Sequence, residues 1–299
     1  MSKSKKDFKK IINQKICFFL KSPIGHILPD TVFLKAIYRL TIHKKLNIKN
    51  PKSFNEKMQW LKLNDRRPKY ITMADKHAVK EYVSNIIGSD YIIPTLGIWD
   101  SFDDIDFDQL PNKFVLKCTH DSGGILICKD KNLLNKSNAK ALLERSLKTN
   151  YYYKGREWQY KDVPPKIIAE QFMETENDDL QDYKFMCFNG KVKCCLVCTD
   201  RNTGEGVHMS FLDNDWKIMP FKRPGCPPIK EDINKPYNYE KMIELAERLS
   251  AGIPFVRVDF YEANKKIYFG ELTFHPSGGF KKFEPEEWDN ILGSWIQLN

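Results

Sequence analysis

The chain has 299 residues, of which 41% are hydrophobic and 29% are charged, the proportions of an ordinary globular protein. It contains no uninterrupted apolar run of about 18 residues, which excludes a membrane-spanning helix. Its formal net charge of +9 resides in residues 1–50, where 12 Lys and Arg face 2 Asp and Glu, while the rest of the chain balances to −1. Nucleic acid is therefore not expected as a partner, because the body of the chain carries no basic excess.

The basic segment combines its lysines with apolar residues at helical spacing, namely Phe8, Ile12, Ile16 and Phe19. A basic amphipathic helix of this kind fits an anionic membrane surface, and we expect residues 1–22 to bind one. The plainer alternative is a helix that packs on its own domain. The apolar run is too short for a secretory signal peptide, and the 8 scattered cysteines indicate reduced thiols. We expect a cytoplasmic protein that attaches to the inner face of the membrane.

The first half of the chain mixes helices and strands. A capping box from Ser53 to Glu56 predicts a helix over residues 53–63, and apolar spacing predicts a second helix over 73–87. An aspartate-rich loop follows at 101–111. Beyond it the pattern predicts, in order, a strand at 113–118, a returning strand at 125–128, a helix at 136–149, an aromatic loop at 151–165 and a strand at 167–171.

The second half begins with two predicted strands, 183–188 and 191–199, whose Asn189-Gly190 connection is a strong hairpin signal. Residues 200–235 are rich in Pro and Gly and are expected to be irregular. The remaining elements are predicted to be a helix at 239–249, a hairpin within 255–279 and a helix at 285–295. This mixture indicates an α+β fold that follows the basic helical segment at 1–50.

The predicted hairpin FVRVDFYEANKKIYFGELTFHPSGG is the most informative stretch. Side chains alternate faces along a strand, so a loop at 263–267 places Asp259 directly opposite Glu271. Arg257 and Thr273 share their face, whereas the opposite face collects the apolar residues Val256, Val258, Phe260, Tyr268, Leu272 and Phe274. Facing carboxylates repel each other unless a divalent cation lies between them, since hard cations bind carboxylate oxygens. The alternative is an exposed hairpin whose charges are incidental.

Two upstream features fit a nucleotide. Lys117 ends a strand and the glycine turn Ser122-Gly123-Gly124 follows, so backbone N–H groups and a lysine can meet phosphate oxygens. The turn is not a Walker A loop, because the pattern GxxxxGK[ST] is missing. Farther on, the strand end from Glu170 to Met173 can offer backbone hydrogen bonds and an apolar wall to an adenine ring. Each feature is weak alone, and their order along the chain makes the set specific.

That order resembles the ATP-grasp superfamily, and more closely its TupA-like branch of teichuronopeptide and capsular polysaccharide biosynthesis. The resemblance runs from about Pro51 to Phe280, through the phrases PKSFNEKMQWLKL, ADKHAVKEYV, NKFVLKCTHDSGG, AEQFM, DYKFMCFNGK and RVDFYEANKKIYFGELTFHPSGGF. It implies an ATP-grasp fold, in which interlocked α+β lobes at 112–299 clamp ATP between antiparallel sheets. Residues 51–111 would form a helical region ahead of these lobes.

The resemblance also implies a role for each matching residue. ATP phosphates would contact Lys76, Lys117, Lys184 and the covering turn Ser122, Gly123 and Gly124, and the nucleoside would contact Glu170, Gln171, Met173 and Asp182. Mg²⁺ would bind Asp259, Glu271 and Thr273, although the wider superfamily has Asn where this chain has Thr273. The carboxylate substrate would contact His275, Ser277 and Gly278, and catalysis would fall to Arg257, Lys117 and Lys184.

Enzymes of this superfamily phosphorylate a carboxylate and then let an amine attack the acyl phosphate. The resemblance implies that the carboxylate belongs to a hexuronic acid of a surface glycan, or of its nucleotide- or lipid-linked precursor. The amine would be an amino acid or a similar small amine. A glycosyltransferase is the main alternative, because Asp104-Ile105-Asp106 matches the metal-binding DxD pattern of sugar-nucleotide enzymes. A kinase acting on a hydroxyl and a binding protein without ATP chemistry also stay open at this point.

Overall fold

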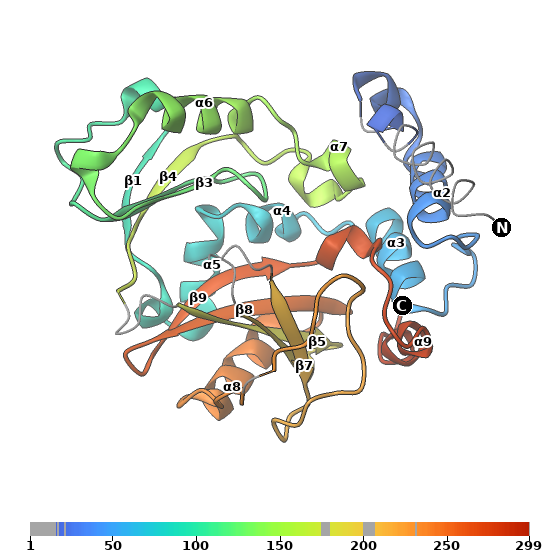
Figure 1. Cartoon of the computed structure of the whole chain (residues 1–299). Helices are drawn as coiled ribbons and strands as arrows, with labels where there is room; N and C mark the ends of the chain where they lie inside the picture. Colours follow the sequence, from blue (N-terminus) through green and yellow to red (C-terminus); the bar gives the residue numbers. More distant parts are fainter. Residues whose placement is uncertain are drawn as a thin grey trace.

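The computed structural model describes residues 16, 18–20, 22–174, 180–199, 207–230 and 232–298. Two antiparallel sheets form its centre and lie one above the other in Figure 1, with α6 (Lys136–Leu147) over the outer face of the upper sheet and α8 (Tyr239–Ser250) under the lower one. The architecture is α+β, as the sequence pattern predicts. Among the described residues, no helix has the length and apolar character that crossing a membrane requires.

The upper, four-stranded sheet comprises β1 (Thr95–Trp99), β2 (Phe114–Cys118), β3 (Ile125–Cys128) and β4 (Ile167–Gln171), in the order β1-β4-β2-β3. Its outer face packs on α6 through a core that includes Phe114, Leu116, Leu143 and Ile167. Alternation therefore turns Lys117 and Glu170 to the inner face. The sequence predicted β2, β3 and β4 but not β1, which is half exposed and shows no apolar alternation.

The lower, five-stranded sheet comprises β5 (Gln181–Phe188), β6 (Lys191–Thr199), β7 (His208–Leu212), β8 (Phe255–Ala263) and β9 (Lys266–Thr273), in the order β7-β6-β5-β8-β9. The predicted Asn189-Gly190 hairpin is confirmed, because both residues have the positive φ values, 50° and 81°, that such a turn requires. The expectation that residues 200–235 are irregular was wrong in part, because β7 pairs with β6 from Leu212 to His208.

The hairpin of β8 and β9 confirms the predicted pairing of Asp259 with Glu271 and of Arg257 with Thr273. Its turn is shorter than expected, because only Asn264 and Lys265 lie between the strands. A bulge at Gly270 compensates, since Phe260 pairs with Phe269 and the next pair is already Asp259 with Glu271. The bulge also corrects one assignment: Phe269 is buried in the core, and Tyr268 lies on the opposite face.

The helical region that precedes the sheets contains α3 (Phe54–Asn64), α4 (Lys69–Ala74) and α5 (Ala78–Ile87). The capping box of α3 is confirmed, with Ser53 Oγ accepting from the Glu56 amide and Glu56 Oε2 accepting from the Ser53 amide. The single helix predicted at 73–87 was wrong, because the chain breaks between α4 and α5. At this break the Lys76 amide donates to the Thr119 carbonyl at 3.0 Å, and the Asp75 carboxylate caps α5.

Helix α3 belongs to the core of the lower sheet. Phe54 and Met58 of α3 cluster with Phe255 of β8 and with Leu292 of the C-terminal helix α9 (Glu287–Ser294), which confirms the helix predicted there. Helices α4 and α5 likewise contribute to the core of the lower sheet, together with α8. The remaining elements are single turns: η2 (Ser89–Tyr91), η3 (Phe102–Asp104), η4 (Lys131–Leu133), α7 (Tyr152–Gly155), η5 (Trp158–Tyr160) and η6 (Pro276–Gly279).

The N-terminal segment is described from η1 (Pro23–Ile27) and α2 (Asp30–Thr41) onward, with a few residues before them. Phe33, Leu34, Ile37 and Tyr38 of α2 belong to a separate apolar cluster, against which Leu63 of α3 packs. The predicted amphipathic helix falls largely outside the described residues, because Phe8 and Ile12 are not among them. Membrane binding by residues 1–22 therefore stays a prediction at this point.

Candidate functional site

The facing strands β8 and β9 carry a cluster of charged side chains on one face. Arg257 lies at its centre, and its Nε and Nη2 donate to Asp259 Oδ1 and Oδ2 at 2.7 and 2.6 Å. The same Nη2 donates to Glu271 Oε1 at 2.8 Å and to Thr273 Oγ1 at 3.0 Å. Four residues that alternation placed on one face are thus joined through one guanidinium.

Lys184 and Asp182 of β5 extend this cluster into the sheet. Lys184 Nζ donates to Asp259 Oδ2 at 2.5 Å and to Asp182 Oδ2 at 2.6 Å. Burial raises the pKa of Asp259, but Arg257 and Lys184 outweigh it and hold this pKa below its usual range. Burial lowers the pKa of Lys184, but the carboxylates of Asp259, Asp182 and Glu271 together outweigh it and the net change is upward. Both groups are therefore charged at neutral pH, which a buried pair requires.

Glu170 at the end of β4 pairs with two lysines on the inner face of the upper sheet. Its Oε2 accepts from Lys117 Nζ of β2 at 2.5 Å, and its Oε1 lies 2.6 Å from Lys80 Nζ of α5. Lys80 also donates to the Ile93 carbonyl at 2.8 Å and to Thr95 Oγ1 at 2.9 Å. Burial raises the pKa of Glu170, yet the two lysines hold it below its usual range. The pairing leaves one net positive charge.

Lys76 hydrogen-bonds the segment after β2 and feels the charge of Glu271 on the lower sheet. Its Nζ donates to the Cys118 carbonyl at 2.8 Å and to the Asp121 carbonyl, both at the end of β2. Burial lowers the pKa of Lys76; the charges of Asp121 and Glu271 act against this change and that of Lys117 adds to it. Lys76 therefore lies within electrostatic reach of both Lys117 and Glu271, which belong to different sheets.

The glycine turn after β2 is held at its base and open at its tip. The Asp121 carboxylate accepts from the Gly124 amide at 3.2 Å and from Ser146 Oγ of α6. A Cβ at Gly124 would lie 2.4 Å from Ser146 Oγ, so only glycine fits there. A Cβ at Gly123, in contrast, would meet no described atom within 4 Å. Ser122 and Gly123 are exposed.

The turn that follows β9 is fixed to α3. Ser277, Gly278 and Gly279 have φ values of 53°, 63° and 64° in succession. Lys62 Nζ, which is buried, donates to the Gly278 carbonyl at 2.7 Å, and Gln59 Nε2 donates to the Gly279 carbonyl at 2.9 Å. A Cβ at Gly279 would lie 2.5 Å from Met58 Cβ, so the close approach requires glycine. Of this turn, Ser277 is exposed and Gly278 is half-buried.

His275, the third predicted substrate contact, points into the protein. It is 6% exposed, and its Nδ1 lies 3.6 Å from Glu157 Oε2 and 3.3 Å from Gln159 Nε2. Burial lowers the pKa of this imidazole, so it is neutral at pH 7. Its contacts link the β9 turn to the aromatic loop at 151–165.

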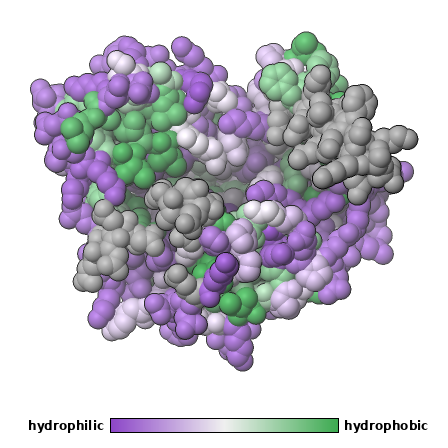
Figure 2. Space-filling view, viewed as in Figure 1, coloured by the Kyte–Doolittle hydropathy of each residue, from purple (hydrophilic) through white to green (hydrophobic). Residues whose placement is uncertain are grey.

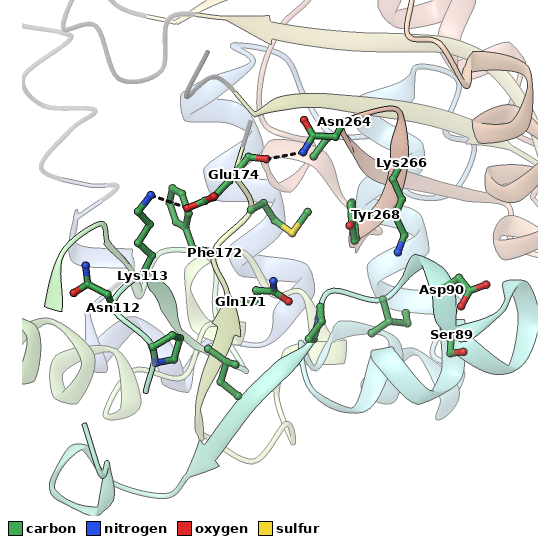
Figure 3. A pocket seen from close by; sticks show the side chains of 16 residues that line it. Ser89, Asp90, Asn112, Lys113, Gln171, Phe172, Glu174, Asn264, Lys266 and Tyr268 are labelled. Carbon is green, nitrogen blue, oxygen red and sulfur yellow. Dashed lines mark hydrogen bonds and ion pairs between the residues drawn. The ribbon is translucent and has the colours of Figure 1, made fainter. Parts of the chain in front are cut away.

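A cavity of about 1020 Å³ opens where the chain passes from β4 toward the lower sheet. Figure 3 shows Gln171 and Phe172 on one side and Tyr268, Lys266 and Asn264 of the β8–β9 hairpin on the other. Met173 also lines it, as do residues of η2 and β1. Lys113 closes one side through its ion pair with Glu174 at 2.6 Å. The backbone that sequence analysis assigned to an adenine ring therefore borders a cavity of ligand size.

The donor set on β8 and β9 suits Mg²⁺ bound together with phosphates. No described group of three or more His, Cys, Asp and Glu side chains is arranged as a metal site. Asp259 and Glu271 nevertheless supply two carboxylates across one ladder position, with the Thr273 hydroxyl 2.9 Å from Glu271 Oε1. Mg²⁺ typically takes one or two protein carboxylates and fills its other positions with water and phosphate oxygens. These residues fit that mode.

Sequence analysis missed three residues near the site. Lys80 of α5 was missed, because its contact with Glu170 of β4 joins segments that are far apart in the sequence. Tyr151 and Tyr160 were assigned only to an aromatic loop. Tyr151 lies near Ser122 and feels the charge of Glu271, while Tyr160 feels those of Glu271 and Arg257. Burial raises the pKa of Tyr151 to about 12, so its hydroxyl stays protonated.

The DxD pattern forms a local turn instead of a shared site. Asp104 Oδ2 accepts from Ser101 Oγ at 2.8 Å and from the Ser101 amide at 3.2 Å. Asp106 accepts from the Asp108 amide at 3.0 Å and from Gln109 Nε2 at 2.8 Å. Each carboxylate thus caps its own segment of the loop, and no described contact joins either one to the charged cluster on β8 and β9.

No curated protein sequence matches the chain. Among solved structures, D-alanine–D-alanine ligase from Bacillus anthracis, complexed with ATP, is 15% identical, with 68% of this chain and 54% of that chain covered and a TM-score of 0.40. D-alanyl-alanine synthetase A from Vibrio cholerae is 12% identical, with 68% and 55% covered and a TM-score of 0.41.

A third similar structure is the ATP-grasp ligase PsnB, complexed with a precursor variant, Mg and ADP. It is 10% identical, with 73% of this chain and 56% of that chain covered and a TM-score of 0.38. The chain spans about half the length of these ligases. The TupA-like ATP-grasp family matches residues 56–297, which is most of the chain and includes both sheets and the charged cluster. The protein belongs to the TupA-like ATP-grasp family and has its α+β fold.

Proposed function

We propose that the protein is an ATP- and Mg²⁺-dependent carboxylate–amine ligase. The observation that carries this proposal is a pair of charged groups of opposite excess charge, one on each sheet. Asp259, Glu271 and Arg257 lie on the lower sheet, and Lys117 lies on the upper one. Lys76 is within electrostatic reach of both groups. Such a site can hold a polyphosphate between cations and a carboxylate-bound metal.

The first step in the proposed reaction makes an acyl phosphate. A substrate carboxylate oxygen attacks the γ-phosphorus of ATP, the bond to the bridging oxygen breaks, and ADP leaves with that electron pair. Phosphoryl transfer asks the protein mainly for positioning and charge neutralisation. Lys117 supplies positive charge from the upper sheet, and Lys76 supplies it from the break between α4 and α5. Asp259, Glu271 and Thr273 would hold Mg²⁺, which neutralises phosphate charge when it is bound.

The second step makes the amide. The amine attacks the acyl carbon, the carbonyl oxygen becomes an oxyanion, and phosphate leaves as the carbonyl re-forms, while the amine proton passes to solvent or phosphate. Arg257 suits the role of stabilising the oxyanion, because its carboxylate neighbours raise its already high pKa and keep it cationic. The exposed Ser277 and half-buried Gly278 of the turn after β9 are proposed to contact the carboxylate substrate. Lys62 and Gln59 would hold that turn in place.

The nucleoside is proposed to occupy the cavity at the end of β4. Support comes from its lining, because the backbone of Gln171 to Met173 can hydrogen-bond an adenine edge while Phe172 and Tyr268 offer aromatic walls. In this arrangement Glu170 serves mainly to pair Lys117 and Lys80. Asp182, which was expected at the ribose, is buried beside Lys184 and serves the charged cluster.

For the substrates, we propose a hexuronic acid unit of a surface glycan, or of its nucleotide- or lipid-linked precursor, and an amino acid or small amine. This finer proposal rests on the family resemblance and not on a contact in the site. Glycosyl transfer finds no comparable support, because Asp104 and Asp106 cap their own loop.

Hydroxylamine trapping tests the reaction class. With ATP, Mg²⁺ and hydroxylamine, the protein should convert the right uronic acid to a hydroxamate and release one ADP for each bond. A screen across uronic acids and amino acids, read out as ADP release, identifies the pair. Arg257→Ala should abolish both products, whereas Asp104→Asn should leave them unchanged. Consumption of a nucleotide sugar without ATP, lost in Asp104→Asn, would overturn the ligase proposal.

A further inference from the structure

Six large apolar side chains are exposed within a short N-terminal stretch, and we call them the N-terminal apolar surface: Ile16, Phe18, Phe19, Ile24, Ile27 and Val32. Ile27 is 86% exposed, Phe18 79% and Ile24 63%. Figure 2 shows apolar residues gathered at the outer tip of this segment. Single exposed apolar residues are normal, but a cluster on one segment marks an interaction surface.

The charges beside this surface are positive. On α2, Val32 shares an exposed face with Lys35 and Arg39, at spacings of three and seven residues. The stretch from residue 16 to 50 contains one acidic residue, Asp30. Its carboxylate is already neutralised, because it lies 2.7 Å from Arg66 and 3.6 Å from Arg156. The apolar surface is therefore bordered by cations without a free carboxylate in the same stretch.

Arg156 anchors this surface to the body of the protein. Its side chain is almost fully buried, and its Nη2 donates to the Gly25 carbonyl at 2.9 Å and to the Leu28 carbonyl at 3.2 Å. Its guanidinium also stacks on the Phe33 ring at 4.6 Å, and His26 stacks on Tyr153 at 3.8 Å. The surface is thus held by a loop that starts at Tyr151, a residue that lies near Ser122 of the glycine turn.

We propose that the N-terminal apolar surface, with Lys35 and Arg39, docks on an anionic lipid bilayer. Exposed Phe and Ile beside Lys and Arg is the chemistry of proteins that lie at a membrane interface. A second copy of this chain fits less well, because it would bring together two segments that each carry a balance of +10 over residues 1–50. Docking would place the loop beside the site near the bilayer, where a lipid-linked substrate is presented.

Vesicle co-sedimentation of the full chain tests the proposal. The protein should pellet with phosphatidylglycerol-containing vesicles at low salt, and not with pure phosphatidylcholine vesicles. Ile27→Asp should weaken this binding at least about tenfold, because a carboxylate replaces an inserted apolar side chain. Lys35→Gln and Arg39→Gln should each weaken it about fivefold, the effect of one cation near an anionic surface.

Matched controls come from other exposed positions. Leu133→Asp alters a side chain that is 82% exposed on η4, and Lys217→Gln removes a lysine whose side chain is 76% exposed, so neither should change vesicle binding. An equal loss of vesicle binding in Leu133→Asp, or equal pelleting with both vesicle types, would refute docking by the N-terminal apolar surface. If the protein self-associates without lipid and Ile27→Asp abolishes this self-association, the N-terminal apolar surface binds a second copy of the chain instead.

Two further measurements distinguish a loss of docking from misfolding and from coverage of the surface by the chain itself. ADP release without vesicles should be unchanged in Ile27→Asp, so a failure of docking is distinguishable from misfolding and from a failure of the ligase proposal. Deletion of residues 1–15 should reduce binding by removing lysines but should leave it sensitive to Ile27→Asp. If the deletion raises binding, those residues cover the apolar surface in the full chain, and docking by that surface is refuted.

Discussion

The two sheets contribute charge to the site in different ways. On the lower sheet, Arg257, Asp259, Glu271 and Thr273 come from two neighbouring strands and contact one another directly. On the upper sheet, Lys117 and Glu170 come from paired strands, but their third partner, Lys80, comes from a helix in a separate part of the chain. The first group is a local arrangement, and the second depends on tertiary packing.

The difference decides what each group can do. The lower cluster balances two cations, Arg257 and Lys184, against three carboxylates, Asp182, Asp259 and Glu271. It therefore has the excess of negative charge that a metal needs. The upper group sets two lysines against one carboxylate and retains the positive charge that phosphates need. The sheets thus present opposite charges to the space between them.

Among the substitutions proposed here, Glu271→Gln should lower activity the most, because it breaks the lower cluster. It removes a proposed metal ligand, and turnover should fall at least about a hundredfold, since metal charge stabilisation is worth several kcal/mol. Thermal stability should change little, because the Glu271 side chain is 47% exposed. The measurements are ADP release and the melting temperature.

A matched variant on the same hairpin controls for disturbance of the strands. Glu262→Gln alters another β8 carboxylate, which bonds Asn238 at 2.9 Å and lies away from the cluster. Its turnover should stay within about twofold of the unchanged protein, since Gln keeps an oxygen that can accept from the Asn238 amide and no described contact joins the residue to the cluster. Full activity in a folded Glu271→Gln protein would contradict the metal assignment.

The lower cluster could be predicted because strand alternation is a local rule. The pairing of Asp259 with Glu271 needed only the position of the turn, and the bulge at Gly270 restored the pairing that a shorter turn would have shifted. The bulge itself had a sequence signal: apolar positions run through Ile267 and Phe269, then change parity after a glycine. Reading that change would have placed Tyr268 on the site face.

Lys117→Met and Lys80→Met test whether the two lysines of the upper group have different roles, one in turnover and one in stability. Lys117 bonds Glu170 alone among the described residues and can turn to a phosphate, so its loss should lower turnover about tenfold to a hundredfold. Lys80 also bonds the Ile93 carbonyl and Thr95, so its loss should mainly cost stability, about 1–3 kcal/mol for groups left unpaired. ADP release and urea unfolding separate the two effects.

In both variants Glu170 keeps one lysine, so neither leaves its carboxylate without a cation. The reverse pattern, with stability lost in Lys117→Met and turnover lost in Lys80→Met, would exchange the two roles. Equal losses of turnover and stability in both variants would mean that the pair acts as one structural unit.

The upper group could be predicted only in part, because its geometry depends on contacts between distant segments. The break between α4 and α5 exists because the Lys76 amide bonds the Thr119 carbonyl, a contact that helical spacing does not reveal. Strand β1 is fixed by pairing with β4 and not by its own pattern. The burial of His275 has the same origin, since its partner Glu157 comes from a distant segment of the chain.

Tyr268→Ala and Phe269→Ala form the subtlest test, because these neighbours lie on opposite faces of one strand. Phe269 is 4% exposed in the core, so its truncation should cost about 3–5 kcal/mol in the free energy of unfolding. Tyr268 lines the cavity, so its truncation should leave stability unchanged and raise the KM for ATP about two- to tenfold, the worth of one aromatic contact.

The expected effects of both substitutions follow from the bulge at Gly270. The bulge turns Phe269 to the core, while Glu271 stays on the same face as Asp259. Without the bulge, Phe269 and Glu271 would share a face, and Tyr268 would join the core in place of Phe269. If Tyr268→Ala lowers the melting temperature and Phe269→Ala changes only the KM, the register beyond Gly270 is wrong. If both unfold the protein, Tyr268 supports the hairpin and the nucleoside contacts a different wall. Circular dichroism melts and ATP titrations of the two variants distinguish these outcomes.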